Sequence, residues 1–228
     1  MDSISNLIIF HDHHYLLANK PSGMPVQEDK TGDSNLLRMM QAYCKHDLFL
    51  CNRIDRPVSG AVLLAKNKES QQHLSKWSYG KDFKKTYLAI VPIVEIPEMG
   101  TWTDFLFHDT KFNKSRIEKS ALHKDAKKAT LHYRIVQTLD QYRLLEITTE
   151  TGRFHQIRSQ LASRNMPIKG DVKYGARRGN KDRSIGLHAW KISWIHHSLN
   201  KKMEFEIKLP DQDIWKHFEL FDGIKIPS

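Results

Sequence analysis

Short apolar segments of strand length follow one another along most of the chain, joined directly by polar turns rather than by helices. We expect strands at residues 7–10, 15–18, 61–65, 86–91, 131–136, 144–149, 187–195 and 203–209. Apolar residues at helical spacing predict helices over 35–45 with Ser34 as N-cap, over 67–77, from about Arg153 onward, and over 211–221. Because strands outnumber helices and do not alternate with them, we predict an α+β fold, a mixed, largely antiparallel central sheet flanked by helices and loops.

Length and composition favour one folded domain over residues 1–228. Of the 228 residues, 39% are hydrophobic, and 5 Trp and 10 Phe are enough for a substantial core. No apolar run approaches the roughly 18 residues that span a bilayer, and the first residues lack the basic and apolar regions of a signal peptide. Two cysteines cannot form a disulfide framework. We therefore exclude secreted, membrane and disulfide-scaffold classes and expect a cytoplasmic protein, by default a monomer.

Basic residues exceed acidic ones by a wide margin. The 36 Lys and Arg residues against 26 Asp and Glu residues give a formal net charge of +10. Such a balance favours a polyanionic partner, above all a nucleic acid. Positive charge gathers in residues 111–128 and 173–183, which are polar and aperiodic, so we expect both to be loops. Lys173, Arg177 and Arg178 in the second of them are candidate nucleic-acid contacts.

A carboxylate lies between two arginines just before an apolar strand. Asp55 is flanked by Arg53 and Arg56, and the apolar residues 61–65 follow. An aspartate has an unperturbed pKa of about 3.9, which neighbouring cations lower, so the group is expected to be ionised. It would be a poor general acid at neutral pH but a competent nucleophile or base. The alternative is a structural ion pair at a turn.

Two further segments hold polar residues between apolar ones. Tyr87 lies in the expected strand 86–91, where a core or edge aromatic is the common role. A helix from about Arg153 would place His155 and Arg158 on one face, with Phe154, Ile157 and Leu161 forming the packed stripe. A guanidinium in that position could pair bidentately with a carboxylate from elsewhere in the chain.

In combination these segments are far more specific than any of them alone. In order, the motifs are Asp55-x-x-x-Ser59-Gly60, Lys85-x-Tyr87-Leu88-Ala89 and Thr151-Gly152-Arg153-x-His155-Gln156-Ile157-Arg158. The set resembles the RluA-type family of RNA pseudouridine synthases over nearly the whole chain, from the Asn19–Gly23 turn to Leu187-His188-Ala189. The resemblance implies the pseudouridine synthase catalytic fold and an isomerase that detaches uracil from its ribose and rejoins it through carbon.

The resemblance also implies roles for individual residues. Asp55 would be the nucleophile, Tyr87 would stack near the target base and remove its C5 proton, and Arg158 would pair with Asp55. Arg53 would fill the gap left by the flipped nucleotide, a flip that costs a few kcal/mol. Arg153 and His155 join the expected RNA contacts. No metal and no organic cofactor is implied.

Four positions depart from the family pattern. Asn52, Val58 and Phe154 stand where the family usually has His, Thr and Thr, and Gln160 stands where many members have His. These departures affect substrate range more than the reaction. Because the first expected strand begins near residue 7, we expect no separate N-terminal RNA-binding domain. The expected partner is a structured RNA, a ribosomal RNA or tRNA stem-loop, with no DNA and no membrane.

Two other classes of function stay open. A catalytically silent RNA-binding protein of the same fold would need none of Asp55, Tyr87 and Arg158. A metal-dependent hydrolase could use the His11-Asp12-His13-His14 run, because histidine and carboxylate ligands suit zinc. That run lies in an expected hairpin turn, where clustered histidines are ordinary in a chain that has 13 of them, and the same holds for His196-His197.

Overall fold

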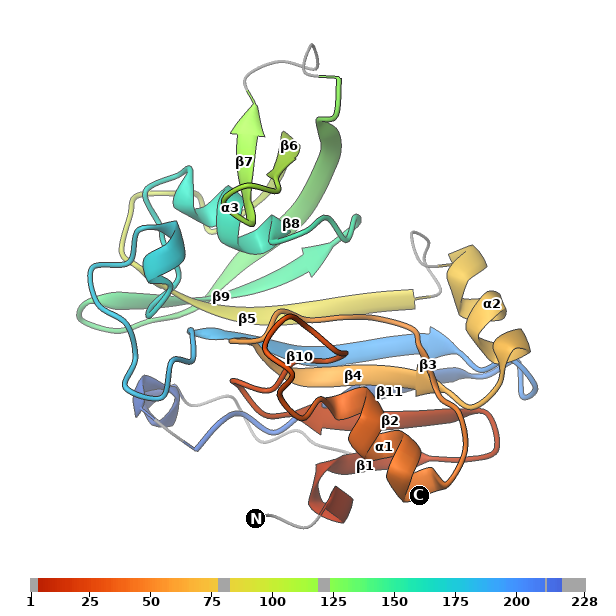
Figure 1. Ribbon diagram of the computed structural model, residues 1–228. Coiled ribbons are helices and arrows are strands. Elements are labelled where there is room, and N and C mark those ends of the chain that lie inside the picture. Colours follow the sequence, from red (N-terminus) through yellow and green to blue (C-terminus); the bar gives the residue numbers. More distant parts are fainter. Residues whose placement is uncertain (1–3, 78–82, 119–123, 212, 219–228) are drawn as a thin grey trace. The chain divides into compact units, whose positions relative to one another are not determined.

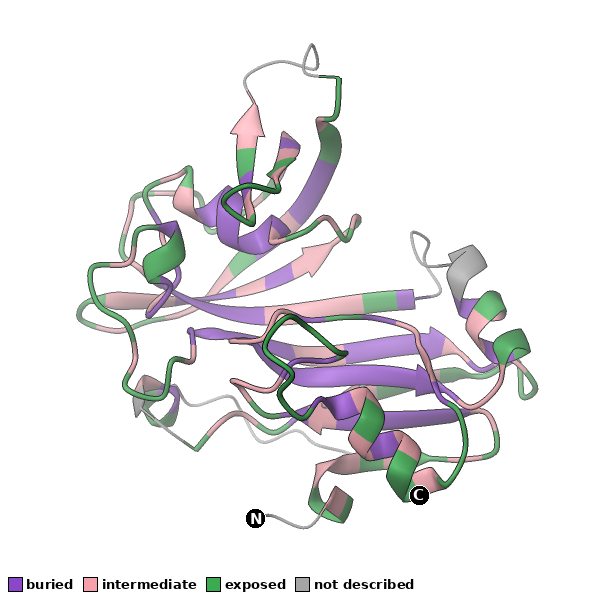
Figure 2. Cartoon of the chain, in the orientation of Figure 1, coloured by how far each residue is buried: buried purple, intermediate pink, exposed green. Residues whose placement is uncertain are grey.

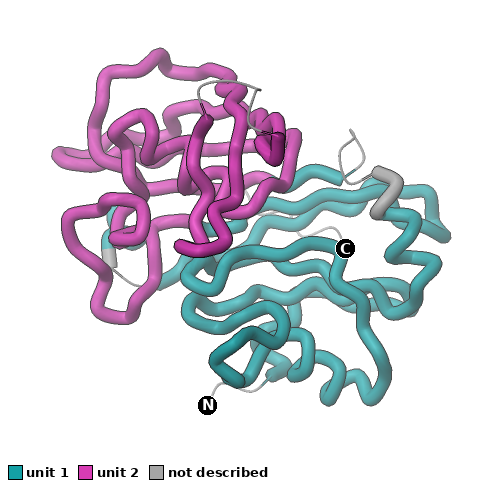
Figure 3. Tube along the Cα trace, turned by 45° about the horizontal axis from the view of Figure 1, so that its top comes forward, with its two compact units in different colours: residues 1–85, 188–228 teal, residues 86–187 magenta. Residues whose placement is uncertain are grey.

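The computed structural model describes residues 4–77, 83–118, 124–211 and 213–218. The chain divides into two compact units, shown in Figure 3. The first unit comprises Met1–Lys85 and His188–Ser228, and the second comprises Thr86–Leu187. Both are built on strands that pair mostly antiparallel, with helices and loops beside them (Figure 1), which confirms the predicted fold class.

Paired strands form the centre of the first unit. They are β1 (Ile8–His11), β2 (Tyr15–Lys20), β3 (Phe49–Leu50), β4 (Ser59–Ala65), β10 (Leu187–Ile195) and β11 (Lys202–Glu206). The order is β1-β2-β4-β10-β11, and β3 pairs with the end of β4. All seven residues of β4 are buried (Figure 2). A strand covered on both faces needs a continuous apolar sequence, which is why residues 61–65 do not alternate with polar ones.

Two helices belong to this unit, α1 (Leu36–Cys44) and α2 (Lys68–Trp77). The Asn67 side chain accepts a hydrogen bond from the Ser70 backbone N–H at 2.8 Å, so the expected start of α2 is confirmed. The N-cap of α1 is Asn35 rather than Ser34. The Asn35 backbone is extended, and its side chain accepts a hydrogen bond from Arg38 N–H at 3.0 Å.

The unit also contains two short 3₁₀ turns, η1 (Ile4–Leu7) and η3 (Asp213–His217). The predicted helix over 211–221 is therefore wrong in type for the residues described there, and 212 and 219–221 lie outside them. Among the helices that the structure describes, none is long and apolar enough to cross a membrane.

In its described residues, the second unit is an antiparallel sheet with one helix. Its strands are β5 (Phe83–Pro92), β6 (Met99–Asp109), β7 (Lys114–Glu118), β8 (Lys127–Thr138) and β9 (Tyr142–Thr149), in the order β5-β9-β8-β6-β7. The helix α3 (Gln156–Ala162) and the 3₁₀ turn η2 (Val172–Tyr174) follow. Leu88, Leu131, Leu145 and Leu161 are fully buried and form part of its core.

The expected loop over 111–128 is wrong in part. It contains β7, which pairs with β6 from Asp109–Lys114 to Phe105–Glu118, and the first residues of β8, while 119–123 lie outside the described residues. Neither β6 nor β7 was predicted. Strand β7 has only five residues and is at the edge of the sheet, where lysine and arginine are common because they discourage pairing with another chain. The charged residues of this segment therefore led to the prediction of a loop where the structure has a strand.

The helix expected from about Arg153 begins three residues later. His155 adopts a left-handed backbone with φ of 48° and ψ of 30°, so the helical hydrogen bonds begin only after it. The Gln156 side chain stabilises this entry, because its Oε1 accepts hydrogen bonds from Arg153 N at 3.1 Å and from Thr151 Oγ1 at 2.8 Å. The prediction that Phe154 packs in the helix stripe is wrong, since Phe154 is exposed.

Candidate active site

Asp55 lies in the first unit, on the loop between β3 and β4. The Asn52 side chain ties this loop to β4: its Nδ2 donates to Ala61 O at 3.0 Å, and its Oδ1 accepts from Leu63 N at 2.7 Å. A turn follows, closed by the hydrogen bond from Val58 N to Asp55 O at 3.0 Å. Val58 is buried, and Asp55 itself is half-buried. The departure at Asn52 therefore has a structural role, which is to fix the approach to Asp55.

Gly60 lies near the start of β4, directly after this loop. It has a φ of +111°, and a Cβ atom built there would lie 2.3 Å from Ala189 O. This close approach occurs where β4 and β10 run parallel, with Ser59 beside His188 and Gly60 beside Ala189. The Ser59 Oγ and His188 Nδ1 atoms are 2.8 Å apart in the buried interior. The Ser59-Gly60 motif thus allows two strands to meet closely, five residues from Asp55.

A buried lysine that sequence analysis did not single out lies beside this loop. The Lys20 side chain has no exposed surface, and its ammonium donates to the carbonyl oxygens of Pro21, Met24 and Arg56 at 2.9, 2.7 and 3.2 Å. Burial lowers the pKa of Lys20 to about 7, while the Asp55 carboxylate acts in the opposite direction. The three N–H donors of an ammonium match three carbonyl acceptors, whereas a neutral amine has only two. We infer that Lys20 is charged and links the Pro21–Met24 turn to the Asp55 loop.

The two arginines beside Asp55 point to different partners. Arg56 donates through Nε to Gly23 O at 2.9 Å and through Nη1 to Thr31 Oγ1 at 3.0 Å, and it also pairs with Asp29 and Asp33. It therefore holds the 23–33 segment in place. Arg53 is exposed, and its Nη1 lies 3.5 Å from Gln27 Oε1.

Arg158 and Tyr87 lie in the second unit. Arg158, on α3, is buried and forms a bidentate ion pair with Asp171: Nε to Oδ2 at 2.7 Å and Nη2 to Oδ1 at 2.8 Å. Its guanidinium also lies over the Tyr174 ring, 4.9 Å from the centroid. Tyr87 is half-buried on β5, opposite Ile147 of β9. The pairing of Arg158 with Asp55, which belongs to the other unit, stays a prediction.

Asp171 is a partner that the sequence did not identify. It is buried, and it precedes η2, in which Lys173 is exposed. The sequence signal was weak, because a lone aspartate thirteen positions after an arginine has no helical or strand relationship to it. Only the fold of the 163–175 segment brings the carboxylate to the guanidinium.

The remaining predicted RNA contacts are distributed over the same unit. Arg153 is half-buried and donates through Nε to Lys128 O at 3.1 Å. The His155 ring contacts the Tyr174 hydroxyl through Nδ1 at 2.9 Å, and burial lowers the pKa of His155 to about 3, helped by the charge of Arg158. Arg177 and Arg178 are exposed. Whether these side chains touch RNA stays a prediction.

The departure at Gln160 is a packing feature. Gln160 has no exposed surface, and its Nε2 donates to Asp104 Oδ2 of β6 at 2.7 Å. Arg164 also pairs with Asp104, through Nη1 to Oδ2 at 3.0 Å. The amide therefore joins α3 to β6.

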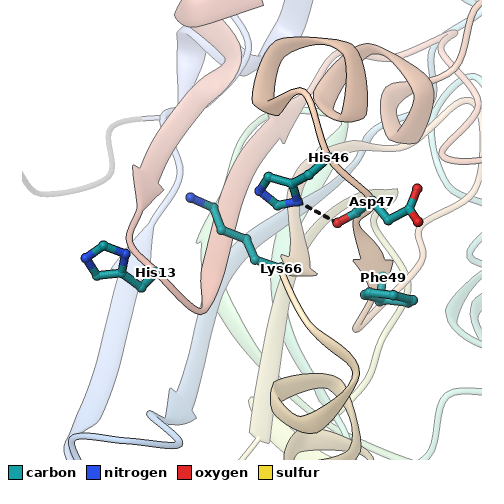
Figure 4. Close-up of a pocket in the computed structure, with 5 residues that line it drawn as sticks. All are labelled: His13, His46, Asp47, Phe49 and Lys66. Carbon is teal, nitrogen blue, oxygen red and sulfur yellow. Dashed lines mark hydrogen bonds between the residues drawn. The ribbon is translucent and has the colours of Figure 1, made fainter.

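A separate hollow of about 480 Å³ lies in the first unit (Figure 4). Its lining residues are His13, His46, Asp47, Phe49 and Lys66. Lys66 directly follows the last residue of β4, whereas the Asp55 loop precedes the first, so the hollow is at the opposite end of that strand. Its lining includes His13 of the histidine run but none of the residues predicted for catalysis or RNA binding.

The histidine run in the β1–β2 turn is engaged in ordinary contacts. The Asp12 carboxylate accepts hydrogen bonds from the backbone N–H groups of His14 and Tyr15, each at 2.7 Å, and its other oxygen contacts His196 Nε2 at 2.7 Å. Within the described ranges, no group of three or more His, Cys, Asp or Glu side chains is arranged to hold a metal ion. The geometry therefore does not favour a hydrolase built on this run.

The comparisons with known proteins agree with the motif pattern. Residues 14–163 match the family model described as RNA pseudouridylate synthase. The chain belongs to this family. A relative named ribosomal large subunit pseudouridine synthase C, from Buchnera aphidicola, is 32% identical over 215 residues, which cover 87% of this chain and 65% of the relative. The uncharacterized RNA pseudouridine synthase YlyB of Bacillus subtilis is 30% identical, over 90% of this chain and 69% of its own length.

Solved structures share the fold. The human protein RNA pseudouridylate synthase domain containing 1 superposes with a TM-score of 0.77 at 21% identity, covering 94% of this chain and 89% of that one. Human RNA pseudouridylate synthase domain containing 4 gives a TM-score of 0.72 at 23% identity, covering 91% and 90%. The predicted membership of the RluA-type family and the pseudouridine synthase fold are confirmed.

Proposed function

We propose that the protein is an RNA pseudouridine synthase, which isomerises a specific uridine in a structured RNA. The observation that carries the proposal is the match of residues 14–163 to the family, because this range contains Asp55, Tyr87 and Arg158. In the reaction the bond between the ribose and N1 of uracil breaks, a bond from the ribose to C5 forms, the C5 hydrogen leaves as a proton, and N1 takes up a proton.

Four residues are assigned roles in the reaction. Asp55, on a loop fixed by Asn52 and Lys20, acts as the nucleophile. Arg158 steers the carboxylate, and Tyr87 stacks beside the uracil and accepts the C5 proton. Arg53, which is exposed next to Asp55, occupies the gap that the everted nucleotide leaves, since a guanidinium plane stacks well on unpaired bases.

Ribosomal RNA is the substrate class that we favour. The Buchnera relative carries ribosomal large subunit in its name, and the net charge of +10 suits a large polyanion. Arg53, Arg153, His155, Lys173, Arg177 and Arg178 are the proposed RNA contacts. Catalysis is proposed to need no cofactor, and the protein is proposed to work as a cytoplasmic monomer.

The test is to incubate the purified protein with unmodified ribosomal RNA and, separately, with unmodified tRNA, and to map pseudouridine in both. We expect product at one or a few uridines of ribosomal RNA. Product confined to tRNA would change the substrate class. RNA binding without product in either pool would favour the catalytically silent alternative.

A further inference from the structure

An exposed column of aromatic rings lies in the second unit beside Arg158. The Phe154 ring stacks on His155 with centroids 3.8 Å apart and an angle of 18° between the planes, and it contacts His108 of β6 at 4.1 Å and 38°. Phe154 keeps 37% of its surface exposed, and His108 is exposed as well. Adjoining ring faces at the surface are a candidate binding site, because they can stack on nucleobases.

Hydrogen bonds from Ser115 and Tyr174 support the column. The Ser115 hydroxyl donates to Phe154 O, and Ser115 N–H donates to the Tyr174 hydroxyl at 2.8 Å. The Tyr174 hydroxyl also contacts His155 Nδ1 at 2.9 Å. His155 has the left-handed backbone that ends the preceding loop. These contacts fix the backbone of Phe154 and the ring of His155 before any ligand arrives, so less entropy is lost on binding.

The His155 ring carries no charge, and the charges of Arg158 and Lys173 act on it. Burial and Arg158 lower the pKa of His155 to about 3, so that ring is neutral at physiological pH and stacks without desolvating a charge. The β6–β7 hairpin contributes Lys111 and Lys114, whereas Arg116 lies opposite Phe107 in the strand register and is ion-paired with Asp109 at 3.0 Å. Lys114 lies 4.7 Å from the Tyr174 ring centroid, and Arg116 lies 5.3 Å from that of Phe112, which is 56% exposed.

We propose that the His108–Phe154–His155 column stacks on an unpaired base of the substrate RNA, while Lys111 and Lys114 bind the adjacent phosphates. Flat π-faces next to cations are what single-stranded RNA requires, because every base can stack and every phosphate is an anion. The proposal rests on the proposed function, since the base would flank the uridine that is isomerised. It adds His108, Phe154 and the β6–β7 hairpin to the expected contact at His155, as a surface that positions the RNA.

The test separates stacking from charge. Binding of a fluorescent oligoadenylate of about ten nucleotides is compared with that of an abasic ribose-phosphate oligomer of equal length and charge. The variants are His108→Leu and Phe154→Leu, which remove a ring, and the control is His108→Phe, which keeps one. Thermal melting checks that each variant folds.

We expect His108→Leu and Phe154→Leu to weaken oligoadenylate binding by roughly 5- to 150-fold and to leave abasic binding and the salt dependence unchanged. His108→Phe should bind like the wild type. Equal losses on both oligomers, or no loss on either, would overturn the proposal. If the wild type forms no pseudouridine yet shows the ring-dependent loss, the proposed function fails and the stacking surface stands. If it is active and the loss is absent, only the stacking surface fails.

Discussion

Arg158 and Asp171 form a bidentate ion pair in which both side chains are at least 95% buried, with N–O distances of 2.7 and 2.8 Å. The pair fixes the plane of the guanidinium through Nε and Nη2. An arginine that must present itself to a nucleophilic carboxylate benefits from such a support, because its rotamer is set before the substrate binds.

Removing the carboxylate should therefore be costly. Asp171→Ala leaves a buried guanidinium without this partner, and we expect the free energy of unfolding to fall by about 3–5 kcal/mol. Urea denaturation monitored by circular dichroism measures this loss. Asp140→Ala, at an exposed turn between β8 and β9, is the matched control and should change stability by less than about 0.5 kcal/mol. If Asp171→Ala lowers the free energy of unfolding no more than Asp140→Ala does, the ion pair does not stabilise the fold.

Lys20 should support the Asp55 loop. Lys20→Met keeps much of the side-chain volume but leaves the carbonyls of Pro21, Met24 and Arg56 without their donor, at an expected cost of about 1–3 kcal/mol. We also expect slower isomerisation, because the loop that carries Asp55 loosens. Lys68→Met, at an exposed position of α2, serves as the control. If Lys20→Met unfolds at the same urea concentration as the wild type, the ammonium is not a structural link.

Stability should depend on pH through His188. This side chain is 1% exposed, and burial lowers its pKa to about 4, against about 6.5 in an unfolded chain. Between these values the unfolded state binds more protons, so stability falls as pH is lowered from 6.5 to 4, by about 3 kcal/mol from this group. His188→Gln should remove the part of this dependence that comes from His188, while the part that comes from His155 stays. His11→Gln, at an exposed position, should keep it. Parallel pH profiles for His188→Gln and the wild type would refute the assignment.

The loop that follows η2 should contribute to RNA binding. Charge reversal at Arg177 and Arg178 is expected to weaken binding and to lower the slope of log affinity against log salt by roughly 0.7 for each lost phosphate contact. Reversal of Lys201 and Lys202, two exposed residues in the first unit, is the control. A slope that is the same for both double variants would show that Arg177 and Arg178 do not touch RNA.

The sequence predicted the parts of the fold that local rules decide. The continuous apolar run at 61–65 identified β4, and Asn67 marked the start of α2, because strand burial and helix capping leave a direct trace in residue type. The three ordered motifs identified the family. What failed depended on distant contacts. The charged residues of the edge strand β7 led to the prediction of a loop. The left-handed backbone of His155 starts the helix later than predicted, and Phe154 is exposed rather than packed.

The same reason explains what the sequence missed at the site. Nothing local indicates that the Lys20 ammonium is buried and bonds to the carbonyl of Arg56, which is 36 residues away, or that Asp171 pairs with Arg158. Both residues support a predicted side chain rather than replace it. Residue type could suggest Asp55 and Arg158, but only the fold could show what holds them.

The central claim is that Asp55 is the nucleophile, and the most direct measurement is release of tritium from C5 of labelled uridine in RNA. Asp55→Asn keeps the size of the side chain and removes its charge, so we expect no detectable release, while the unfolding midpoint and most of the RNA affinity stay at wild-type values. The predicted result is that the wild type releases tritium and that Asp55→Asn, although folded, does not. Residual turnover above about a thousandth of the wild-type rate would contradict a covalent role for this carboxylate.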